Sequence, residues 1–83
     1  MTQTSDDLVE LVRSLVVQIV DNPEVVEVTG SLTEEEDVLV EISVAEDDIG
    51  KIIGRQGRII KAIRTLTRAA ALQANMHVEV ELA

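Results

Sequence analysis

One stretch of the chain decides the fold: Ile49-Gly50-Lys51-Ile52-Ile53-Gly54-Arg55-Gln56-Gly57-Arg58-Ile59-Ile60-Lys61-Ala62-Ile63. Apolar residues recur at helical spacing on both sides of a four-residue segment, 54–57, that begins and ends with glycine. We therefore expect a short helix over about 46–53 and a second helix over about 58–72. Glycine permits backbone angles that other residues resist and lets a ligand approach the main chain closely. The second helix turns the positive end of its dipole toward this segment, which makes the segment a candidate phosphate site.

The basic residues of the chain are concentrated on this same stretch. The net charge is −9, yet six of the seven Lys and Arg residues lie between Lys51 and Arg68, where there is no Asp or Glu. The stretch carries +6, while the rest of the chain holds one arginine against sixteen acids. Such charge segregation is typical of a local site for a polyanion on a body that otherwise repels polyanions.

The cations of the second helix form a stripe. At about 100° per residue, the four of them share about a third of the circumference: Arg58, Lys61, Arg64 and Arg68. An ordinary amphipathic helix with a solvated face would show a similar stripe. However, like charges three or four residues apart cost a few tenths of a kcal/mol per pair, and no acid relieves them here. The pattern therefore favours a functional basic face.

Three further segments alternate between apolar and polar residues, over 25–32, 38–44 and 76–82, and this alternation predicts strands. The acidic turn 33–37 joins the first two strands as an antiparallel hairpin, and the helical crossover lets the second and third strands pair in parallel. With a helix before the hairpin, we predict an α+β fold. It is a single domain, 1–83, in the order α-β-β-α-α-β, with a three-stranded mixed sheet and three helices on one face. The other face should present Glu27, Glu41, Glu79 and Glu81 to solvent.

The first helix is expected to start near two candidate N-caps, Thr4 and Ser5, and to end at Asn22-Pro23. Its apolar arc is wide because Val9 and Val17 extend it. We favour burial of these valines against the chain's own sheet, and the alternative is a contact with another chain. Gly30 is expected to mark a bulge in the first strand. On the second long helix, Leu66 is expected to belong to the apolar arc.

The composition excludes several classes of function. Phe, Tyr and Trp are absent, so the chain lacks the stacking rings that RRM and cold-shock sheets use to bind RNA. Cysteine is absent and His77 is the single histidine, which excludes disulfides, thiolate metal sites and a triad. Neither a P-loop motif nor a nucleophile–base pair is present. We therefore expect no enzymatic activity, no cofactor and no metal, and the acidic turn 33–37 is expected to be merely solvated.

The length and the ends of the chain bear on its location. Residues 1–4 lack the basic region followed by an apolar stretch that opens a signal peptide. No apolar run approaches the ~18–20 residues that a membrane span needs. A cytoplasmic protein without membrane association is therefore the expectation. Because the core has no aromatic residue, self-association or a partner would add stability.

The segment 52–63 resembles the KH signature, I-I-G-x-x-G-x-x-I-x-x-I, in which isoleucines flank a GxxG loop between two helices. The element order resembles the bacterial, type II arrangement of KH domains, and the resemblance covers essentially the whole chain. A stand-alone KH domain of this length is similar to the small bacterial RNA-binding proteins of the KhpA family.

This resemblance implies that the loop clamps the sugar–phosphate backbone of about four unpaired nucleotides, with the bases laid across an apolar groove. Carried over, Gly54 and Gly57 would give access to the backbone, and Arg55 and Gln56 would face phosphates. The other expected contacts are Lys51, Arg58 and Lys61, with Ile53 and Ile49 forming the groove. Relatives often carry a second basic residue where Gln56 stands, so we expect weaker and less salt-sensitive binding.

The resemblance also implies a partner, which is either a second copy of the chain or a KhpB-like KH protein. It implies a role as an RNA chaperone or post-transcriptional regulator, with a link to cell shape and division. The main alternative is a protein-interaction subunit that keeps the KH shape and docks an acidic partner on its basic helix. Double-stranded DNA is a third possibility, but a glycine-bounded loop suits a clamp better than a major-groove reader.

Overall fold

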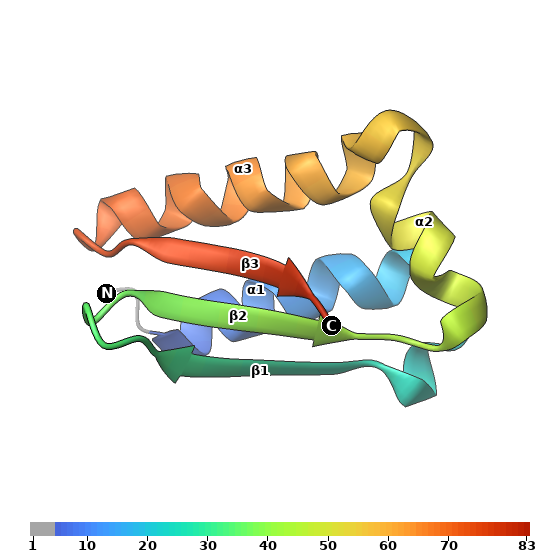
Figure 1. Ribbon diagram of the computed structural model, residues 1–83, viewed down its shortest axis with the longest axis horizontal. Helices are drawn as coiled ribbons and strands as arrows, with labels where there is room; N and C mark the ends of the chain where they lie inside the picture. Colours follow the sequence, from blue (N-terminus) through green and yellow to red (C-terminus); the bar gives the residue numbers. More distant parts are fainter. Residues whose placement is uncertain (1–4) are drawn as a thin grey trace.

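The computed structural model describes residues 5–83 and has the expected element order (Figure 1). The helices are α1 (Ser5–Ile19), α2 (Ile49–Ile53) and α3 (Arg58–Gln73), and the strands are β1 (Glu27–Leu32), β2 (Val38–Ser43) and β3 (Val78–Leu82). Single 3-10 turns occupy Pro23–Val25, Glu46–Asp48 and Arg55–Gly57. The candidate cap Thr4 and the rest of 1–4 lie outside the described residues. No helix within 5–83 is both long enough and apolar enough for a membrane span.

The sheet has the order β1-β2-β3, with β2 in the centre. β1 pairs antiparallel with β2 from Glu27 opposite Ser43 to Leu32 opposite Val38, and β2 pairs parallel with β3 from Val38 opposite Val78 to Ile42 opposite Leu82. The α+β class and the mixed sheet are therefore confirmed. The outward glutamates at 27, 41, 79 and 81 are exposed, as predicted.

The prediction of a bulge at Gly30 is wrong. Gly30 pairs with Val40 in an uninterrupted one-to-one register. A Cβ at this position would lie 2.7 Å from Val9 Cγ2, so the glycine makes room for a side chain of α1. Val9 and Val17 both pack partly buried against the core, which supports burial within the chain as the reason for the wide apolar arc.

The core lies between the sheet and the helices and consists of aliphatic side chains: Leu8, Val12, Val16, Val20, Val26, Val38, Val40, Ile42, Ile52, Ile60, Ile63, Ala71, Val78 and Val80. Leu66, which is expected in the apolar arc, is 53% exposed, and Leu32 is 68% exposed. Leu32 is the last residue of β1. On α3 the sheet-facing place is taken by Thr67, which is fully buried and donates its hydroxyl hydrogen to the Ile63 carbonyl at 2.7 Å.

Candidate nucleic-acid interface

Three of the four residues of loop 54–57 have positive φ. α2 ends at Gly54, which has φ 74° and ψ 175° and donates its N–H to the Gly50 carbonyl at 2.9 Å. Gln56 and Gly57 follow with φ of 57° and 73°, and the Gly57 N–H donates to the Gly54 carbonyl at 3.1 Å. Figure 1 shows that this turn lies at one end of the molecule, where it leads from α2 into α3. The first turn of α3 therefore faces the loop with N–H groups that lack helical partners.

The two glycines of the loop have different surroundings. A Cβ on Gly54 would overlap Ile59 Cγ1, because the backbone there packs directly on the start of α3. A Cβ on Gly57 would meet nothing closer than Lys61 Cε at 3.7 Å. Gly54 thus closes the loop against the helix, while Gly57 borders open space that a ligand can approach.

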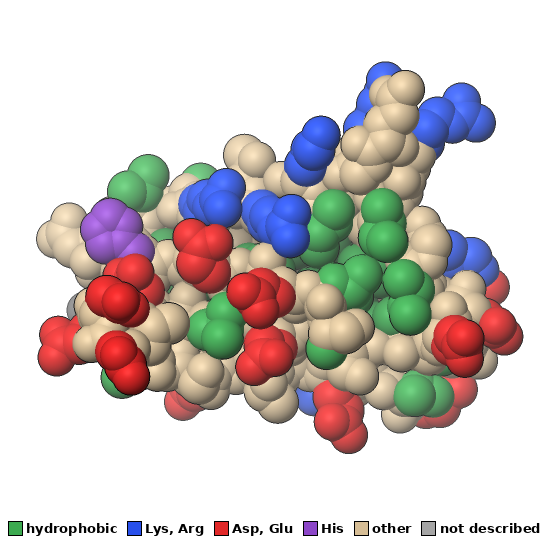
Figure 2. All heavy atoms as spheres, in the orientation of Figure 1, with side chains coloured by type: hydrophobic (Ala, Val, Ile, Leu, Met, Phe, Trp, Pro, Cys, Tyr) green, Lys and Arg blue, Asp and Glu red, His purple; other side chains and the backbone are tan. Residues whose placement is uncertain are grey.

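Polar and basic side chains surround the loop on its open side. Arg55, Gln56 and Arg58 are exposed, and Arg58 Nη2 donates to Gln56 Oε1 at 3.2 Å. Lys61 follows one turn into α3 and is also exposed. Within residues 5–83, neither Arg55 nor Lys61 has an ion-pair partner. Figure 2 shows basic side chains gathered on the protruding loop. The structure therefore brings these four predicted site residues together.

Lys51 lies in a different environment from the other predicted contacts. Its ammonium group forms an ion pair with Asp21, just beyond α1, and lies 3.8 Å from Asp48 Oδ1. The hydrogen bond to Asp21 raises the pKa of Lys51. The charge of Lys51 is thus already compensated within the protein, and its contact with phosphate stays a prediction.

Asp48 is a residue of the site region that sequence reasoning missed. Its carboxylate is fully buried and accepts hydrogen bonds from the N–H of Asp21 at 3.1 Å and from the N–H and the side-chain amide of Asn22, both at 3.0 Å. Burial by itself raises the pKa of Asp48, but these hydrogen bonds and the nearby Lys51 outweigh it and lower the pKa below its ordinary value. Asp48 therefore ties the start of α2 to the end of α1.

The apolar residues expected beside the loop are placed as follows. Ile53, at the end of α2, is 40% exposed, and Ile49 is half-buried. Ile52 between them is fully buried in the core. Figure 2 shows hydrophobic side chains gathered beneath the protruding loop, over α2 and the adjacent ends of β2 and β3. This surface has the composition that a groove for nucleobases requires.

A groove of about 560 Å³ continues from the loop along α3 and β3. The helix lines it with Lys61, Arg64, Thr65 and Arg68, and the strand lines it with Glu79, Val80 and Glu81. Figure 2 shows the row of basic side chains directly above a row of acidic ones. The basic stripe was predicted from helical spacing. Its acidic neighbours were predicted only as solvent-facing residues, because strand alternation does not reveal which helix lies beside a strand.

These features define a KH domain: a β-α-α-β unit whose two helices are joined by a GxxG loop, with a further helix and strand before it. The family model described as "KhpA/KhpB, KH domain" matches residues 9–82. The chain belongs to this family.

Curated relatives cover most of the chain. The protein named "RNA-binding protein KhpA" from Caldanaerobacter subterraneus subsp. tengcongensis is 47% identical over 88% of this chain and 96% of its own length. The protein of that name from Clostridium perfringens is 48% identical over the same shares. The one from Chlamydia pneumoniae is 45% identical over 88% of this chain and 92% of its own length.

The fold also resembles solved structures of larger proteins. Era, in a crystal structure with MgGDPNP and nucleotides 1506–1542 of 16S ribosomal RNA, matches 90% of this chain with a TM-score of 0.60. The match covers 28% of the Era chain at 23% sequence identity. A second structure, of Aquifex aeolicus Era bound to GDP and AlF4−, gives a TM-score of 0.58 over 92% of this chain, 30% of that chain and 20% identity. These likenesses show the fold.

Proposed function

We propose that this chain binds single-stranded RNA and that loop 54–57 holds the sugar–phosphate backbone. The observation that carries the proposal is the loop itself. Its backbone is left-handed on the open side, it stands at the N-terminus of a long helix, and Arg55, Arg58 and Lys61 surround it without an acid between them. Helix N-termini and arginine side chains are the groups that bind phosphates most readily. The name of the relatives, which share 45–48% of their residues with the chain, supports RNA as the ligand.

The apolar surface below the loop supports unpaired bases as the second part of the ligand. Ile53 offers an exposed aliphatic side chain there, and the chain contains no Phe, Tyr or Trp ring on which bases could stack. Bases laid across aliphatic side chains must first be unstacked and unpaired. A single strand therefore suits this surface better than a duplex does.

A charge placed at Gly57 tests the clamp with little damage to the fold. Asp and Asn both tolerate left-handed backbone, and a side chain at this position enters open space. Gly57→Asp should weaken binding of a short unstructured RNA by about tenfold or more, because the carboxylate repels the phosphate. Gly57→Asn has the same shape without the charge and should stay within about threefold of wild type. Fluorescence anisotropy measures both affinities, and circular dichroism checks that both variants are folded.

Equal RNA binding by the two folded variants would contradict the clamp, as would the absence of binding by the wild-type chain. The basic face of α3 would then be better explained as a docking surface for an acidic protein. If both Gly57 variants bound an acidic partner protein equally well, this alternative would be supported, because a contact on the helix face does not involve the loop backbone.

We propose further that the chain acts with a partner, either a second copy or a KhpB-like KH protein, as an RNA chaperone or post-transcriptional regulator. A single loop meets only about two to four phosphates, so its affinity alone is modest. Two linked KH domains convert the second contact into an intramolecular one and raise the overall affinity without any new contact type.

A further inference from the structure

The groove between α3 and β3 changes in character along its length. At the loop end, Lys61 is exposed and has no ion-pair partner within residues 5–83. About one turn further, Arg64 Nε donates to the Val80 carbonyl at 3.0 Å. One turn beyond that, Arg68 Nη2 lies 3.6 Å from Glu79 Oε2. The basic stripe is therefore open near the loop and compensated at its far end.

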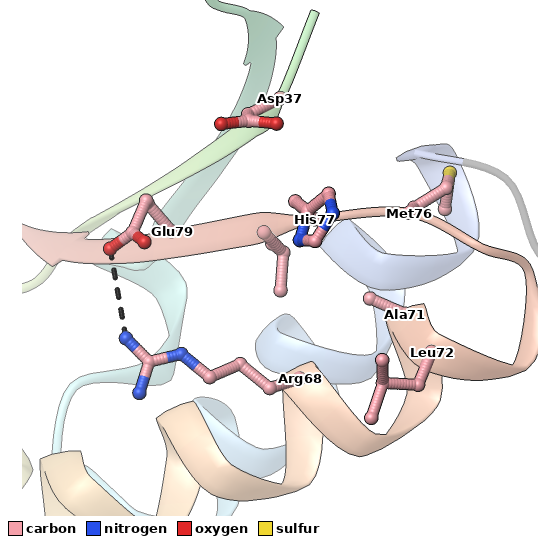
Figure 3. Close-up of a pocket in the computed structure, with 8 residues that line it drawn as sticks. Asp37, Arg68, Ala71, Leu72, Met76, His77 and Glu79 are labelled. Atoms are coloured by element: carbon pink, nitrogen blue, oxygen red, sulfur yellow. Dashed lines mark ion pairs between the residues drawn. The ribbon is translucent and has the colours of Figure 1, made fainter.

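The ion pair between Arg68 and Glu79 separates two hollows of the surface. Both residues line the groove and also a second hollow of about 460 Å³. In Figure 3 the Arg68 side chain extends from α3 toward Glu79 on β3. The remaining residues of the second hollow are Asp37, Ala71, Leu72, Met76, His77 and Val78. A strand of nucleic acid that follows the groove away from the loop has to pass this ion pair.

From this arrangement we infer that Glu79 ends the path of RNA along the groove. The inference rests on the proposed function, and it specifies how far along the groove the RNA site extends. A phosphate that approaches Arg68 comes close to the Glu79 carboxylate, which lies 3.6 Å from the same guanidinium group and already offsets its charge. The carboxylate repels the phosphate, and Glu81, which lines the same groove, adds to this repulsion. Only the part of the basic stripe nearest the loop is left to engage RNA.

The geometry sets how long a bound segment can be. Gly57 and Arg68 are eleven residues apart along one helix, which corresponds to about 16 Å. The groove between them therefore has room for only a few nucleotides beyond those at the loop. Glu79 thus limits the number of nucleotides that the groove can bind. Removal of its charge should extend the RNA site by about one phosphate contact.

A length series of uridine oligomers, from about four to about twelve nucleotides, tests this inference. Glu79→Gln keeps the shape of the side chain and removes its charge. For the shortest oligomer its affinity should equal that of wild type. For the longest it should be about two- to fivefold tighter at low salt, as expected for one freed exposed cation. The slope of log K against log salt should also steepen by a little under one.

Two further variants separate a local effect from a general one. Glu27→Gln removes the same charge from the same face of the sheet, but on β1, two strands from the groove. It should give no gain that depends on oligomer length. Arg68→Gln should cost the wild type little and should abolish the gain in the Glu79→Gln background. This double-mutant cycle measures the coupling between the two residues directly.

The outcomes separate this inference from the proposed function. If wild type binds RNA through the loop and Glu79→Gln changes nothing, the inference is wrong and the clamp stands. If Glu79→Gln and Glu27→Gln tighten binding equally, net charge is the cause and the inference is again wrong. If Gly57→Asp binds as well as Gly57→Asn, the clamp itself fails, and the inference fails with it.

Discussion

At the scale of single residues, Gly54 and Gly57 differ in how much the fold depends on them. Gly54 has φ 74° and ψ 175°, a region that essentially only glycine occupies, and its α-carbon packs against Ile59. Gly57 has φ 73° and ψ 16°, a left-handed conformation that other residues adopt at moderate cost. The motif presents the two positions as equivalent, and the structure shows that they are not.

Gly54→Ala should therefore destabilise the protein more than Gly57→Ala. For Gly54→Ala we expect a loss of about 2–4 kcal/mol, because backbone strain adds to a clash with Ile59. For Gly57→Ala we expect about 1–2 kcal/mol from backbone strain alone. Urea unfolding followed by circular dichroism compares the two free energies of unfolding. Equal losses would mean that Ile59 moves aside at little cost.

Some features of the site could be predicted residue by residue and others could not. The loop and the cations after it were predictable because they are contiguous in the sequence. The ion pair of Lys51 with Asp21 was not, because Asp21 lies thirty positions earlier and only the fold brings it close. The pairing of Arg68 with Glu79 likewise depends on how α3 lies beside β3. Local spacing contains no information on either contact.

At the scale of elements, Asp48 couples α2 to α1 and thereby positions the loop. Its two carboxylate oxygens accept three hydrogen bonds from the segment that follows α1. Because α2 has only five residues, it cannot hold its orientation through its own helical bonds. A buried carboxylate therefore provides the anchor that this short helix lacks.

Asp48→Asn should lower the melting temperature by several degrees at neutral pH. An amide offers one acceptor oxygen where three donors need two, so at least one of these partly buried N–H groups is left without its partner. Asp47→Asn is the matched control, since Asp47 is the exposed neighbour of the same chemistry. Differential scanning calorimetry compares both variants with wild type. Equal melting temperatures for the two variants would contradict the anchor.

The pH dependence of this anchor has a definite sign. The pKa of Asp48 in the folded state lies below its ordinary value, so ionisation of this carboxyl stabilises the folded state above the unfolded pKa. That contribution is lost as the pH falls from about 4 through the folded pKa. The difference in melting temperature between wild type and Asp48→Asn should therefore be constant near neutral pH and shrink under acidic conditions.

The elements themselves were predictable because each has a strong period. The strands expected over 25–32, 38–44 and 76–82 are found at Glu27–Leu32, Val38–Ser43 and Val78–Leu82, so only their ends moved. Gly30 was misread because a glycine in a strand fits both a bulge and a close approach by another element. Leu66 was misread because Thr67 competes for the same place on the helix, and its hydroxyl is satisfied by the Ile63 carbonyl.

At the scale of the whole molecule, most of the cations lie on a different surface from the glutamates of the sheet. Five of the seven cations lie on α3 and on the loop that leads into it, while glutamates from all three strands cover the outer face of the sheet (Figure 2). With a net charge of −9, the molecule as a whole repels nucleic acid. Under the proposed function, RNA is attracted only where the local field of the loop overcomes the field of the body, and binding is then confined to one end of the molecule.

Confinement of this kind predicts a shallow dependence of binding on salt. If the loop and Lys61 meet about two to four phosphates, log K for a short RNA should fall with log salt with a slope of roughly −1.5 to −3. Anisotropy titrations at several salt concentrations measure this slope, and the folded Gly57→Asn variant should reproduce it. A slope of about −3.5 or steeper would mean that phosphates contact all five cations of the loop and the basic stripe, including Arg64 and Arg68, in the wild type. The acids of β3 would then fail to limit the site, and the division of the molecule into an attracting end and a repelling sheet would not govern where RNA binds.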